Sequence, residues 1–394
     1  MLQDEDIVVF GSTYWDDPPI VPRHISSVLA RWNRVLYVET PASYIHLRQF
    51  TKNRVWYRWM LGVRQENPNL HVYTPPPSLP WKTRWRWSNY VTQSYLAPVL
   101  RRVIKAAGMH EPILLTFLPH HYGLVDHLPH KLVCYYCIDE WTALTRFIHP
   151  VTIQTYEDRL AARADLVFAT SRTLETKLRS RNPETYLVPS GTDFELYHGA
   201  LNPALPLPPD IESIPRPILG FCGLFDFRLN QSLLEDLARS RPDWSLVFVG
   251  PAAVDTRRLR GFGNVHFLGR KPVRDLPAYF KAFDVALIPY SLNRMTLSIY
   301  PAKLNECLAA GLPVVATNLP ELVILVPIVR VAETSAGFIQ EVEQALAERD
   351  GRARDARVEF ARKNTWEERA ETISSSILRK LHERGATVAN TAPI

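Results

Sequence analysis

Short apolar runs alternate with helix-forming stretches along almost the whole chain. In the first half the apolar runs predict strands at 7–10, 35–38, 113–117, 132–136, 166–169 and 186–188. In the second half they predict strands at 218–222, 246–249, 265–267, 285–288, 314–316 and 328–331. The segments between them place apolar residues at helical spacing, as in 23–32, 97–108 and 153–164. This alternation predicts an α/β architecture in which parallel sheets are covered by helices on both faces.

A proline-rich stretch separates two such patterns. Residues 202–217, NPALPLPPDIESIPRP, have no apolar period, which is typical of a linker. We therefore expect an N-terminal domain at 1–200, a linker at 201–217, a second domain at 218–364 and a C-terminal helix at 365–394 that can cross back to the first domain. A chain of 394 residues is long enough for two cores. Two doubly wound domains joined in this way are expected to face each other across a cleft, at the carboxyl ends of their strands.

The composition excludes several classes of protein. Hydrophobic residues make up 46% of the chain, which excludes a mainly disordered protein. No apolar run reaches the roughly 18 residues of a membrane span. The N-terminus, MLQDEDIVVF, starts with acids and enters a strand, so we expect no signal peptide. Four scattered cysteines indicate a reducing cytosol. Cys134 and Cys137 form a C-x-x-C pair on a predicted strand, where we expect packing rather than metal or redox chemistry.

The net charge of +6 comes largely from one segment, residues 48–105. Glu66 is its one acid, and its eleven basic residues are Arg48, Lys52, Arg54, Arg58, Arg64, Lys82, Arg84, Arg86, Arg101, Arg102 and Lys105. Five of the ten tryptophans lie there too, namely Trp56, Trp59, Trp81, Trp85 and Trp87. Cations interleaved with tryptophan suit an anionic membrane surface, so we expect a cytoplasmic protein peripheral to the inner face of the membrane. A nucleic-acid platform and a solvated basic face are the alternatives, and we expect no nucleic acid as a partner.

Residues 301–317, PAKLNECLAAGLPVVAT, carry the most specific candidate chemistry. The pattern predicts a helix that begins at Pro301 and ends at Gly311, followed by a buried strand. Lys303 and Glu306 share one face of this helix. The helix dipole opposes a lysine in the first turn unless an anion is bound there, and a diphosphate fits this requirement. Glu306 is then placed to accept hydrogen bonds from a diol such as ribose, whereas the alternative is an ordinary surface ion pair.

This stretch resembles the donor-binding signature of the GT-B fold glycosyltransferases. Supporting similarities occur in the same order along the chain, at 164–174, 186–197, 220–226, 264–290 and 364–370. Over about 160–370 the chain resembles the large retaining family of bacterial cell-surface sugar transferases, of the teichuronic-acid and exopolysaccharide type. The family has a second glutamate eight positions before the conserved one, where this chain has Ser298, so the stereochemical outcome stays open.

The resemblance implies roles for matching residues in the second half. Glu306 would hold the ribose of a nucleotide and Lys303 its phosphates. Gly223 would let the backbone approach the diphosphate. Residues 269–273, with Gly269 and Arg270 at their start, would line the base. Arg228, close to Gly223 and beside Asp226, would reach a phosphate or the sugar, or form an ordinary loop pair with Asp226.

Acidic residues also follow a predicted strand of the first half. Asp139 and Glu140 come directly after the run at 132–136, at the expected cleft. A similar placement supplies the base in the inverting glucuronosyl transferase of xanthan assembly, so Asp139 is the candidate that takes the proton of the acceptor hydroxyl. The alternative for Asp139 is a helix cap.

Other residues of the first half are candidates for acceptor binding. Gly11 ends the first strand, and Asp16 and Asp17 follow it, either to touch the acceptor or to start a turn. His120 and His121 follow the run at 113–117, and we expect them to be exposed loop histidines.

These features together predict a transferase that moves a sugar from a nucleotide diphosphate sugar to a lipid-linked or polysaccharide acceptor in cell-surface glycan synthesis. We expect no cofactor and no metal, because no cluster of His, Cys and carboxylate residues has the spacing of metal ligands and a lysine can neutralise the leaving diphosphate. One alternative is a nucleotide-sugar epimerase of the same architecture. The other is a non-catalytic protein that binds a nucleotide sugar.

Overall fold

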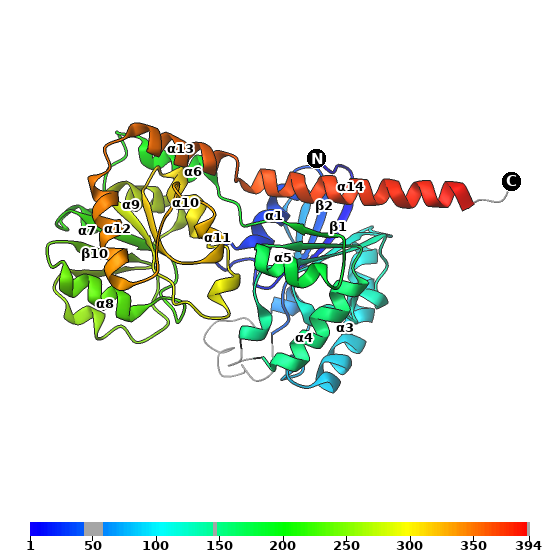
Figure 1. Cartoon of the computed structure of the whole chain (residues 1–394). Coiled ribbons are helices and arrows are strands. Elements are labelled where there is room, and N and C mark those ends of the chain that lie inside the picture. Colours follow the sequence, from blue (N-terminus) through cyan, green and yellow to red (C-terminus); the bar gives the residue numbers. More distant parts are fainter. Residues whose placement is uncertain (43–57, 145–147, 392–394) are drawn as a thin grey trace. The chain divides into compact units, whose positions relative to one another are not determined.

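The computed structural model of the chain describes residues 1–42, 58–144 and 148–391 (Figure 1). They form two compact units. The first consists of Met1–Pro189 together with Trp366–Ile394, and the second of Ser190–Thr365. Each unit is built around its own sheet.

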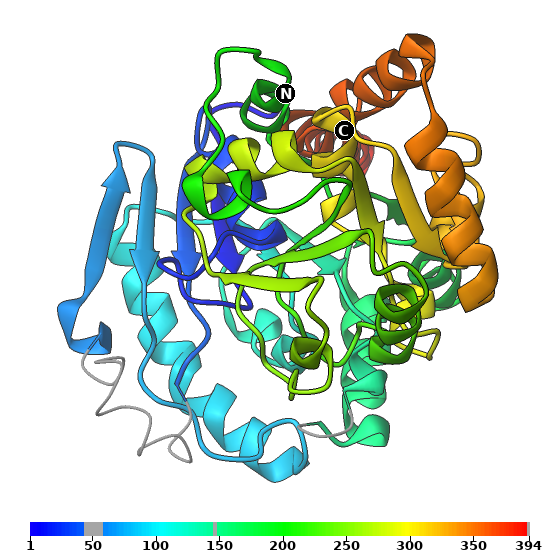
Figure 2. The same ribbon diagram turned by 90° about the vertical axis from the view of Figure 1, so that its left-hand side faces the viewer.

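In the described part of the first unit, eight strands form one sheet in the order β3-β4-β2-β1-β5-β6-β7-β8. Neighbouring strands are parallel, except that β3 is antiparallel to β4. The bounds are β1 Asp6–Phe10, β2 Arg34–Val38, β3 Val63–Asn67, β4 Leu70–Tyr73, β5 Ile113–Thr116, β6 Leu132–Cys137, β7 Leu166–Ala169 and β8 Thr185–Leu187. The apolar runs predict six of these. Strands β3 and β4, at the edge of the sheet in Figure 2, were not predicted. Strand β3 is polar and largely exposed, whereas β4 is mostly buried.

Helices cover both faces of this sheet. On one face Ile7 and Val9 pack with α1 and α14, and on the other Val8 and Phe10 pack with α3, α4 and α5. The bounds are α1 Val21–Leu29, α3 Arg86–Ala106, α4 Pro150–Arg163, α5 Arg172–Arg179 and α14 Trp366–Thr391. The ring of Trp366 at the start of α14 stacks on His24 of α1, with centroids 4.5 Å apart. Helix α14 therefore packs in the core of the first unit, although it is far along the sequence from the rest of that unit.

The described residues of the second unit contain six parallel strands in the order β11-β10-β9-β12-β13-β14. The bounds are β9 Ile218–Cys222, β10 Ser245–Val249, β11 Val265–Gly269, β12 Val285–Ile288, β13 Val314–Thr317 and β14 Arg330–Ala332. The longer helices are α8 Gln231–Ser240, α12 Ser335–Ala347 and α13 Gly351–Arg362, and the shorter ones are α6 Phe194–His198, α7 Pro209–Glu212, α9 Leu276–Ala282, α10 Lys303–Ala309 and α11 Pro320–Val323. Both units are doubly wound and Rossmann-like, so the predicted fold class is confirmed.

The stretch 201–217, expected to be a linker, is part of the second unit. The ammonium group of Lys281 donates to three of its carbonyl oxygens, those of Asn202, Pro203 and Leu205, at 2.9, 2.7 and 2.6 Å. Helix α7 lies within it, and Tyr279 donates to Asp210 there at 2.9 Å. The prolines therefore mark a segment that is docked by side chains from far along the chain, and the boundary between the units falls at Pro189.

The strand order reverses at one place in each sheet. In the first unit the chain passes from β1 outward to β2 and later returns to β5 on the other side of β1. In the second unit the same reversal separates β9 from β12. Ligands of doubly wound sheets bind outside the carboxyl ends of the strands at such switch points. Two places are therefore favoured for ligands, one beside Gly11 and one beside Gly223.

Candidate functional site

Three glycines bring the loops after β9, β10 and β11 together in the second unit. Gly223 has a φ of +153° and Gly250 a φ of +143°, which side-chain-bearing residues rarely adopt. A Cβ on Gly250 would stand 1.9 Å from the carbonyl oxygen of Gly223, so the two loops touch through backbone alone. The N–H of Gly250 donates to the carbonyl of Gly269 at 2.9 Å. The expected residues Gly223 and Gly269 thus belong to one backbone surface, and Gly250 is a member that sequence reasoning missed.

Lys303 and Glu306 lie beside this surface. A Cβ on Gly223 would be 3.7 Å from Cε of Lys303, so the lysine side chain passes directly over the glycine. The ammonium group is 3.0 Å from both carboxylate oxygens of Glu306. Burial alone would lower the pKa of Lys303, but the Glu306 carboxylate outweighs burial and raises it. The lysine is therefore a firmly protonated cation next to open backbone at the switch point.

Helix α10 is shorter than the sequence pattern predicts. It begins at Lys303 instead of Pro301 and has seven residues. Its end agrees with the pattern, because Gly311 has a φ of +72°. Because the helix is so short, we explain the anion-binding character of the site by the Lys303–Glu306 pair and the glycine backbone, and no longer by the helix dipole.

Buried polar groups hold α10 in place. The amide of Asn305 donates to the carbonyl of Ser190 at 2.8 Å and accepts from the hydroxyl of Tyr300 at 2.9 Å. Tyr197 of α6 is buried and hydrogen-bonds Glu306, and burial followed by the Glu306 charge raises the pKa of Tyr197. Tyr197 ends the stretch 186–197 that carries the resemblance, which is the one signal that could have identified it.

The remaining donor-site candidates differ in their surroundings. Arg228 forms a bidentate pair with Asp226, with Nε 2.9 and 3.0 Å from the two carboxylate oxygens. Arg228 and Lys303 both act electrostatically on the buried hydroxyl of Tyr290, whose pKa is raised by burial. Arg270, which follows β11, is exposed. Ser298 is buried and donates to the carbonyl of Arg294 at 3.2 Å.

In the first unit Asp139 lies two residues beyond β6 and is partly buried. Its carbonyl oxygen is 3.3 Å from the thiol of Cys137. Next to it the carboxylate of Glu140 caps a short 3-10 turn, accepting from the N–H of Thr142 at 3.2 Å. The segment that carries Asp139 is therefore fixed at both ends by neighbouring groups.

A buried charge cluster underlies this segment. The ammonium group of Lys177, from α5, is 2.8 Å from Glu140 and 2.6 Å from Glu157 of α4. Burial would raise the pKa of Glu140, but bonds from Lys177 and Thr142 outweigh it and lower the pKa. Burial raises the pKa of Glu157 in spite of Lys177. This cluster could not be predicted from the sequence, because Glu140, Glu157 and Lys177 are separated by 17 (157 − 140) to 37 (177 − 140) positions.

The three acceptor-site candidates lie on the loop after β1. A Cβ on Gly11 would be 2.0 Å from the Tyr37 hydroxyl, so a glycine is needed for packing there. Asp16 is exposed and pairs with Arg58 at 2.9 Å and with Arg64 at 3.4 Å. Asp17 is exposed, and its carboxylate accepts from the N–H of Tyr14 at 3.3 Å. Gly11 and Asp139 follow strands that are separated by β5, at the same edge of the sheet.

The prediction that His120 and His121 are exposed is wrong. His120 is only 6% exposed and His121 only 7%. Both residues lie in a buried 3-10 turn, Pro119–His121, and Asn89 of α3 donates to the carbonyl of His120 at 3.0 Å. The ring of His121 bonds to Thr116 through Nδ1 at 2.9 Å and packs on Phe10. Burial lowers the pKa of His121 to about 3.

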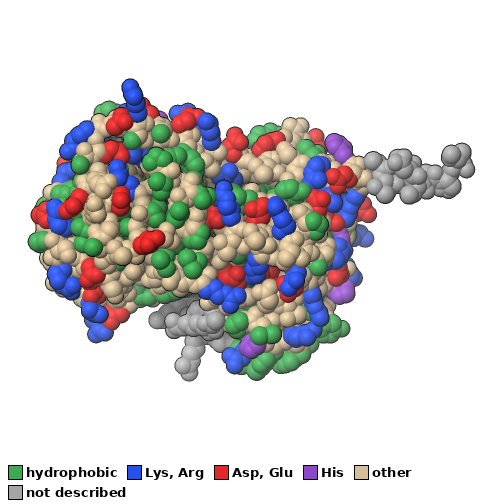
Figure 3. Space-filling model, in the orientation of Figure 1, with side chains coloured by type: hydrophobic (Ala, Val, Ile, Leu, Met, Phe, Trp, Pro, Cys, Tyr) green, Lys and Arg blue, Asp and Glu red, His purple; other side chains and the backbone are tan. Residues whose placement is uncertain are grey.

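Exposed rings mark the segment that leads into α3. We call Trp81, Trp85, Trp87 and Tyr90 the aromatic surface. The indole of Trp85 lies 4.7 Å from that of Trp81 and 5.9 Å from that of Trp87. Trp87 is 60% and Tyr90 68% exposed. Figure 3 shows apolar side chains with lysines and arginines at this lower edge of the first unit.

Part of the basic segment falls outside the described residues, namely Arg48, Lys52, Arg54 and Trp56. In the parts of the chain that are described, no helix combines the length and apolar character needed to span a bilayer.

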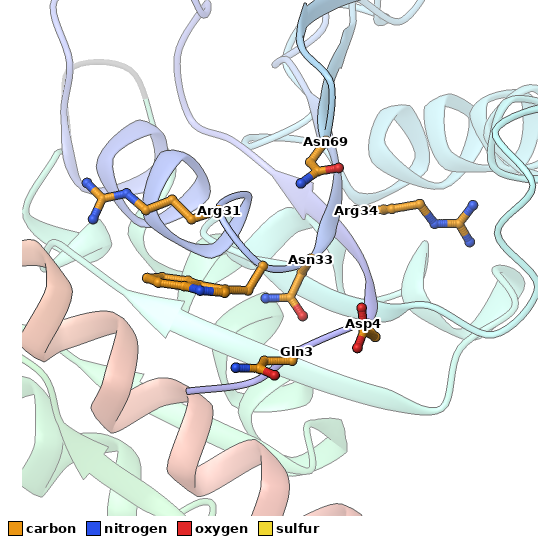
Figure 4. A pocket seen from close by; sticks show the side chains of 7 residues that line it. Gln3, Asp4, Arg31, Asn33, Arg34 and Asn69 are labelled. Atoms are coloured by element: carbon orange, nitrogen blue, oxygen red, sulfur yellow. The ribbon is translucent and has the colours of Figure 1, made fainter.

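A hollow of about 400 Å³ lies at the opposite, amino edge of the first sheet (Figure 4). The amide of Asn33 in it is already bonded to the carbonyls of Leu2 and Leu29 at 3.0 and 2.9 Å. The hollow is lined by Gln3, Asp4, Arg31, Trp32, Asn33, Arg34 and Asn69. Since ligands of doubly wound sheets bind at the carboxyl edge, we assign it no role in the site.

Comparisons with known proteins agree with this architecture. Residues 216–348 match the protein family described as "Glycosyl transferases group 1". The chain is 29% identical over 259 residues to the "Putative teichuronic acid biosynthesis glycosyltransferase TuaH" of Bacillus subtilis (strain 168), and this match spans 61% of the chain and 64% of that protein.

Solved structures are similar over nearly the whole chain. The sucrose-phosphate synthase of Thermosynechococcus elongatus superposes with a TM-score of 0.71 at 16% identity, covering 96% of this chain and all of that one. The Anabaena protein Alr3699/HepE, solved with UDP and glucose, has a TM-score of 0.64 at 14% identity and covers 96% and 99%. The chain therefore has the GT-B fold and, as the sequence analysis expects, resembles the bacterial GT-B glycosyltransferases.

Proposed function

We propose that this protein is a glycosyltransferase that moves a sugar from a nucleotide diphosphate sugar to a lipid-linked or polysaccharide acceptor in cell-surface glycan synthesis. One observation carries the proposal: the side chain of Lys303 passes over Gly223 at the β9/β12 switch point, and its ammonium group is paired with Glu306. Residues 216–348, which match the glycosyltransferase family, contain all three residues. The UDP complex of Alr3699/HepE supports a nucleotide as the ligand.

The donor site follows from the charges. The diphosphate lies along the backbone at Gly223, where Lys303 neutralises the charge that develops when the leaving nucleotide departs. The ribose hydroxyls donate to Glu306, with Gly269 and Arg270 near the base and Arg228 near the phosphate or sugar. Since a fixed ammonium can balance the leaving group, we expect transfer to need neither a metal nor a cofactor.

The first unit supplies the acceptor side. We propose that Asp139 takes the proton of the acceptor hydroxyl. Its segment is fixed by the contacts of Cys137 and Glu140, and it lies at the edge of the sheet where the strands end. Gly11, Asp16 and Asp17 are proposed to line the acceptor's path on the loop after β1. Whether the sugar's configuration inverts or is retained is decided by analysing the anomer of the product.

The aromatic surface is proposed to contact an anionic membrane. Exposed rings occupy the interface between headgroups and hydrocarbon, while Arg84 and Arg86 beside them meet anionic lipid. Such binding would place the protein on the cytoplasmic face, where nucleotide sugars and a lipid-linked acceptor meet.

A screen with nucleotide sugars tests the donor proposal. Purified full-length protein is heated with each member of a panel of UDP-, GDP-, ADP- and CDP-sugars and with the free sugars. A ligand that binds the native state raises the melting temperature by mass action. We expect one base to stabilise the protein, and the matching sugar nucleotide to release nucleoside diphosphate when an acceptor is added. A panel in which no nucleotide stabilises the protein would refute the proposal.

A further inference from the structure

Several buried polar atoms of the first unit have no hydrogen-bond partner among the described residues, and Ser12 Oγ, His120 Nε2 and Trp141 Nε1 are among them. Buried polar groups in native proteins are almost always paired, so each of these atoms calls for an explanation. They share a location, because they lie on the loops that follow β1, β5 and β6, three neighbouring strands. The β1/β5 switch point is among these loops, which is where a doubly wound sheet takes its ligand.

The chemistry of these atoms favours a ligand that accepts hydrogen bonds. An indole N–H can only donate, and a serine hydroxyl and an imidazole N–H can both donate. The two histidine rings meet edge to face with centroids 4.6 Å apart, and the carbonyl of His120 is held from α3 by Asn89. The unpaired nitrogen of His120 is therefore rigidly placed.

A lysine precedes the helix that holds His120. Lys82 lies between the exposed Trp81 and the start of α3, and Asn89 of α3 donates to the carbonyl of His120. After burial, the charge of Lys82 is the next cause that lowers the pKa of both His120 and His121. Burial lowers the pKa of Lys82 to about 8, and no carboxylate contributes to that shift. This lysine differs from Lys303, whose charge is balanced by Glu306. An anionic ligand would balance the charge of Lys82.

We propose that Lys82, His120, Ser12 and Trp141 form a subsite for a phosphate group of the acceptor, and that this acceptor is a lipid phosphate. A phosphate offers several oxygen acceptors for donors that are carried on three neighbouring loops. The lipid source follows from continuity, because Lys82 adjoins the aromatic surface, where the ring of Trp81 is exposed next to it. The inference rests on the proposed function, since it names the chemical class of that acceptor.

Calorimetry on the full-length protein tests the subsite with geranyl diphosphate as the probe. We expect Lys82→Met to weaken binding at least tenfold and Lys82→Arg to restore most of it. Lys363→Met is the matched control, because it removes the same charge from an exposed position of the second unit and should bind like the wild type. Lys303→Ala tests whether the probe binds at the proposed donor site instead, because a larger loss in this variant than in Lys82→Met would overturn the subsite. Geraniol, which has no phosphate, should bind at least tenfold more weakly.

Inorganic diphosphate separates the two sources of phosphate. Affinity equal to that of geranyl diphosphate would overturn the lipid assignment. Unchanged binding by Lys82→Met, or equal losses in Lys82→Met and Lys363→Met, would overturn the subsite. Nucleotide binding, measured on the same samples, reports on the proposed function separately: its absence in the wild type would refute the transferase while leaving a Lys82-dependent phosphate site standing. Near-UV circular dichroism of each variant checks that it is folded.

Discussion

At the scale of single residues, Lys303 and Glu306 form a pair whose partners have different tasks. The lysine faces the glycine backbone, whereas the glutamate is also bonded to the buried hydroxyl of Tyr197. Removing either member leaves the other without its counter-charge, so binding and stability have to be measured together.

We expect Lys303→Ala and Glu306→Ala to weaken donor binding by different routes. Each removes a charge-assisted contact worth about 1.5–3 kcal/mol. Lys303→Ala should weaken nucleoside diphosphate far more than nucleoside, and Glu306→Ala should weaken both, as measured by calorimetry. Lys363→Ala is the control, because it breaks an exposed Lys–Glu pair of the same unit, with Glu359 at 3.0 Å. Wild-type affinity in both site variants would mean that the donor binds elsewhere.

Asp139 is expected to act after the donor is bound. Asp139→Asn keeps the size of the side chain but removes the base, so turnover should fall by about 100-fold or more while nucleotide affinity and stability stay unchanged. Asp126→Asn, an exposed aspartate of the same unit that pairs with Arg163, serves as the control. Near-normal turnover of Asp139→Asn would leave this residue a structural role only.

At the scale of elements, the proposed donor site depends on loops whose backbones touch without intervening side chains. Strands β9, β10 and β11 end next to each other, and the backbone of Gly250 fills the space beside Gly223. In the first unit the loop after β6 is held by ion pairs instead. Lys177 pairs with Glu140, which follows β6, and with Glu157 of α4. Both arrangements fix the position of a loop at the carboxyl edge, where a ligand is expected.

Gly250→Ala tests the contact between the two glycine loops. The new Cβ would meet the carbonyl oxygen of Gly223 at 1.9 Å, in a backbone conformation that alanine rarely adopts. We expect the free energy of unfolding to fall by about 1–3 kcal/mol and nucleotide affinity to fall with it. Gly263→Ala is the control, because its Cβ would meet no atom within 4 Å. Equal stability of the two variants in urea unfolding would show that the loops can separate freely.

At the scale of the whole molecule, the two units present different surfaces. The aromatic surface and the charge of Lys82 belong to the first unit, and the fixed Lys303–Glu306 pair to the second. The proposed function therefore assigns the nucleotide sugar and the membrane-borne acceptor to separate parts of the chain.

Vesicle binding tests the membrane contact. We expect co-sedimentation with anionic but not with neutral vesicles, decreasing with salt, because each cation near anionic lipid contributes about 1 kcal/mol and the effect is screened. Arg84→Glu with Arg86→Glu should reduce this binding but leave transfer to a short soluble acceptor intact. Arg257→Glu with Arg352→Glu makes the same charge change on the second unit and should bind as the wild type does. Equal binding to both kinds of vesicle, or to neither, would return the aromatic surface to a solvated face.

The sequence by itself determined the fold class, because strands buried on both faces need unbroken apolar runs, which are visible in any window of a few residues. It also determined that Lys303 and Glu306 lie together, because a spacing of three is a neighbour on a helix. Strand β3 could not be predicted, since its polar residues pair at an exposed edge.

Only the tertiary structure decided which groups are buried next to which. His120 and His121 look like loop histidines until α3 and Phe10 cover them. Gly250 matters through the backbone of Gly223, and the prolines after residue 201 are docked by Lys281. Periodicity reports the geometry of neighbours along the chain, whereas burial, charge pairing and close backbone approach depend on residues brought from far away. The tertiary fold therefore decided the surroundings of the site, although the sequence had already named several of its residues.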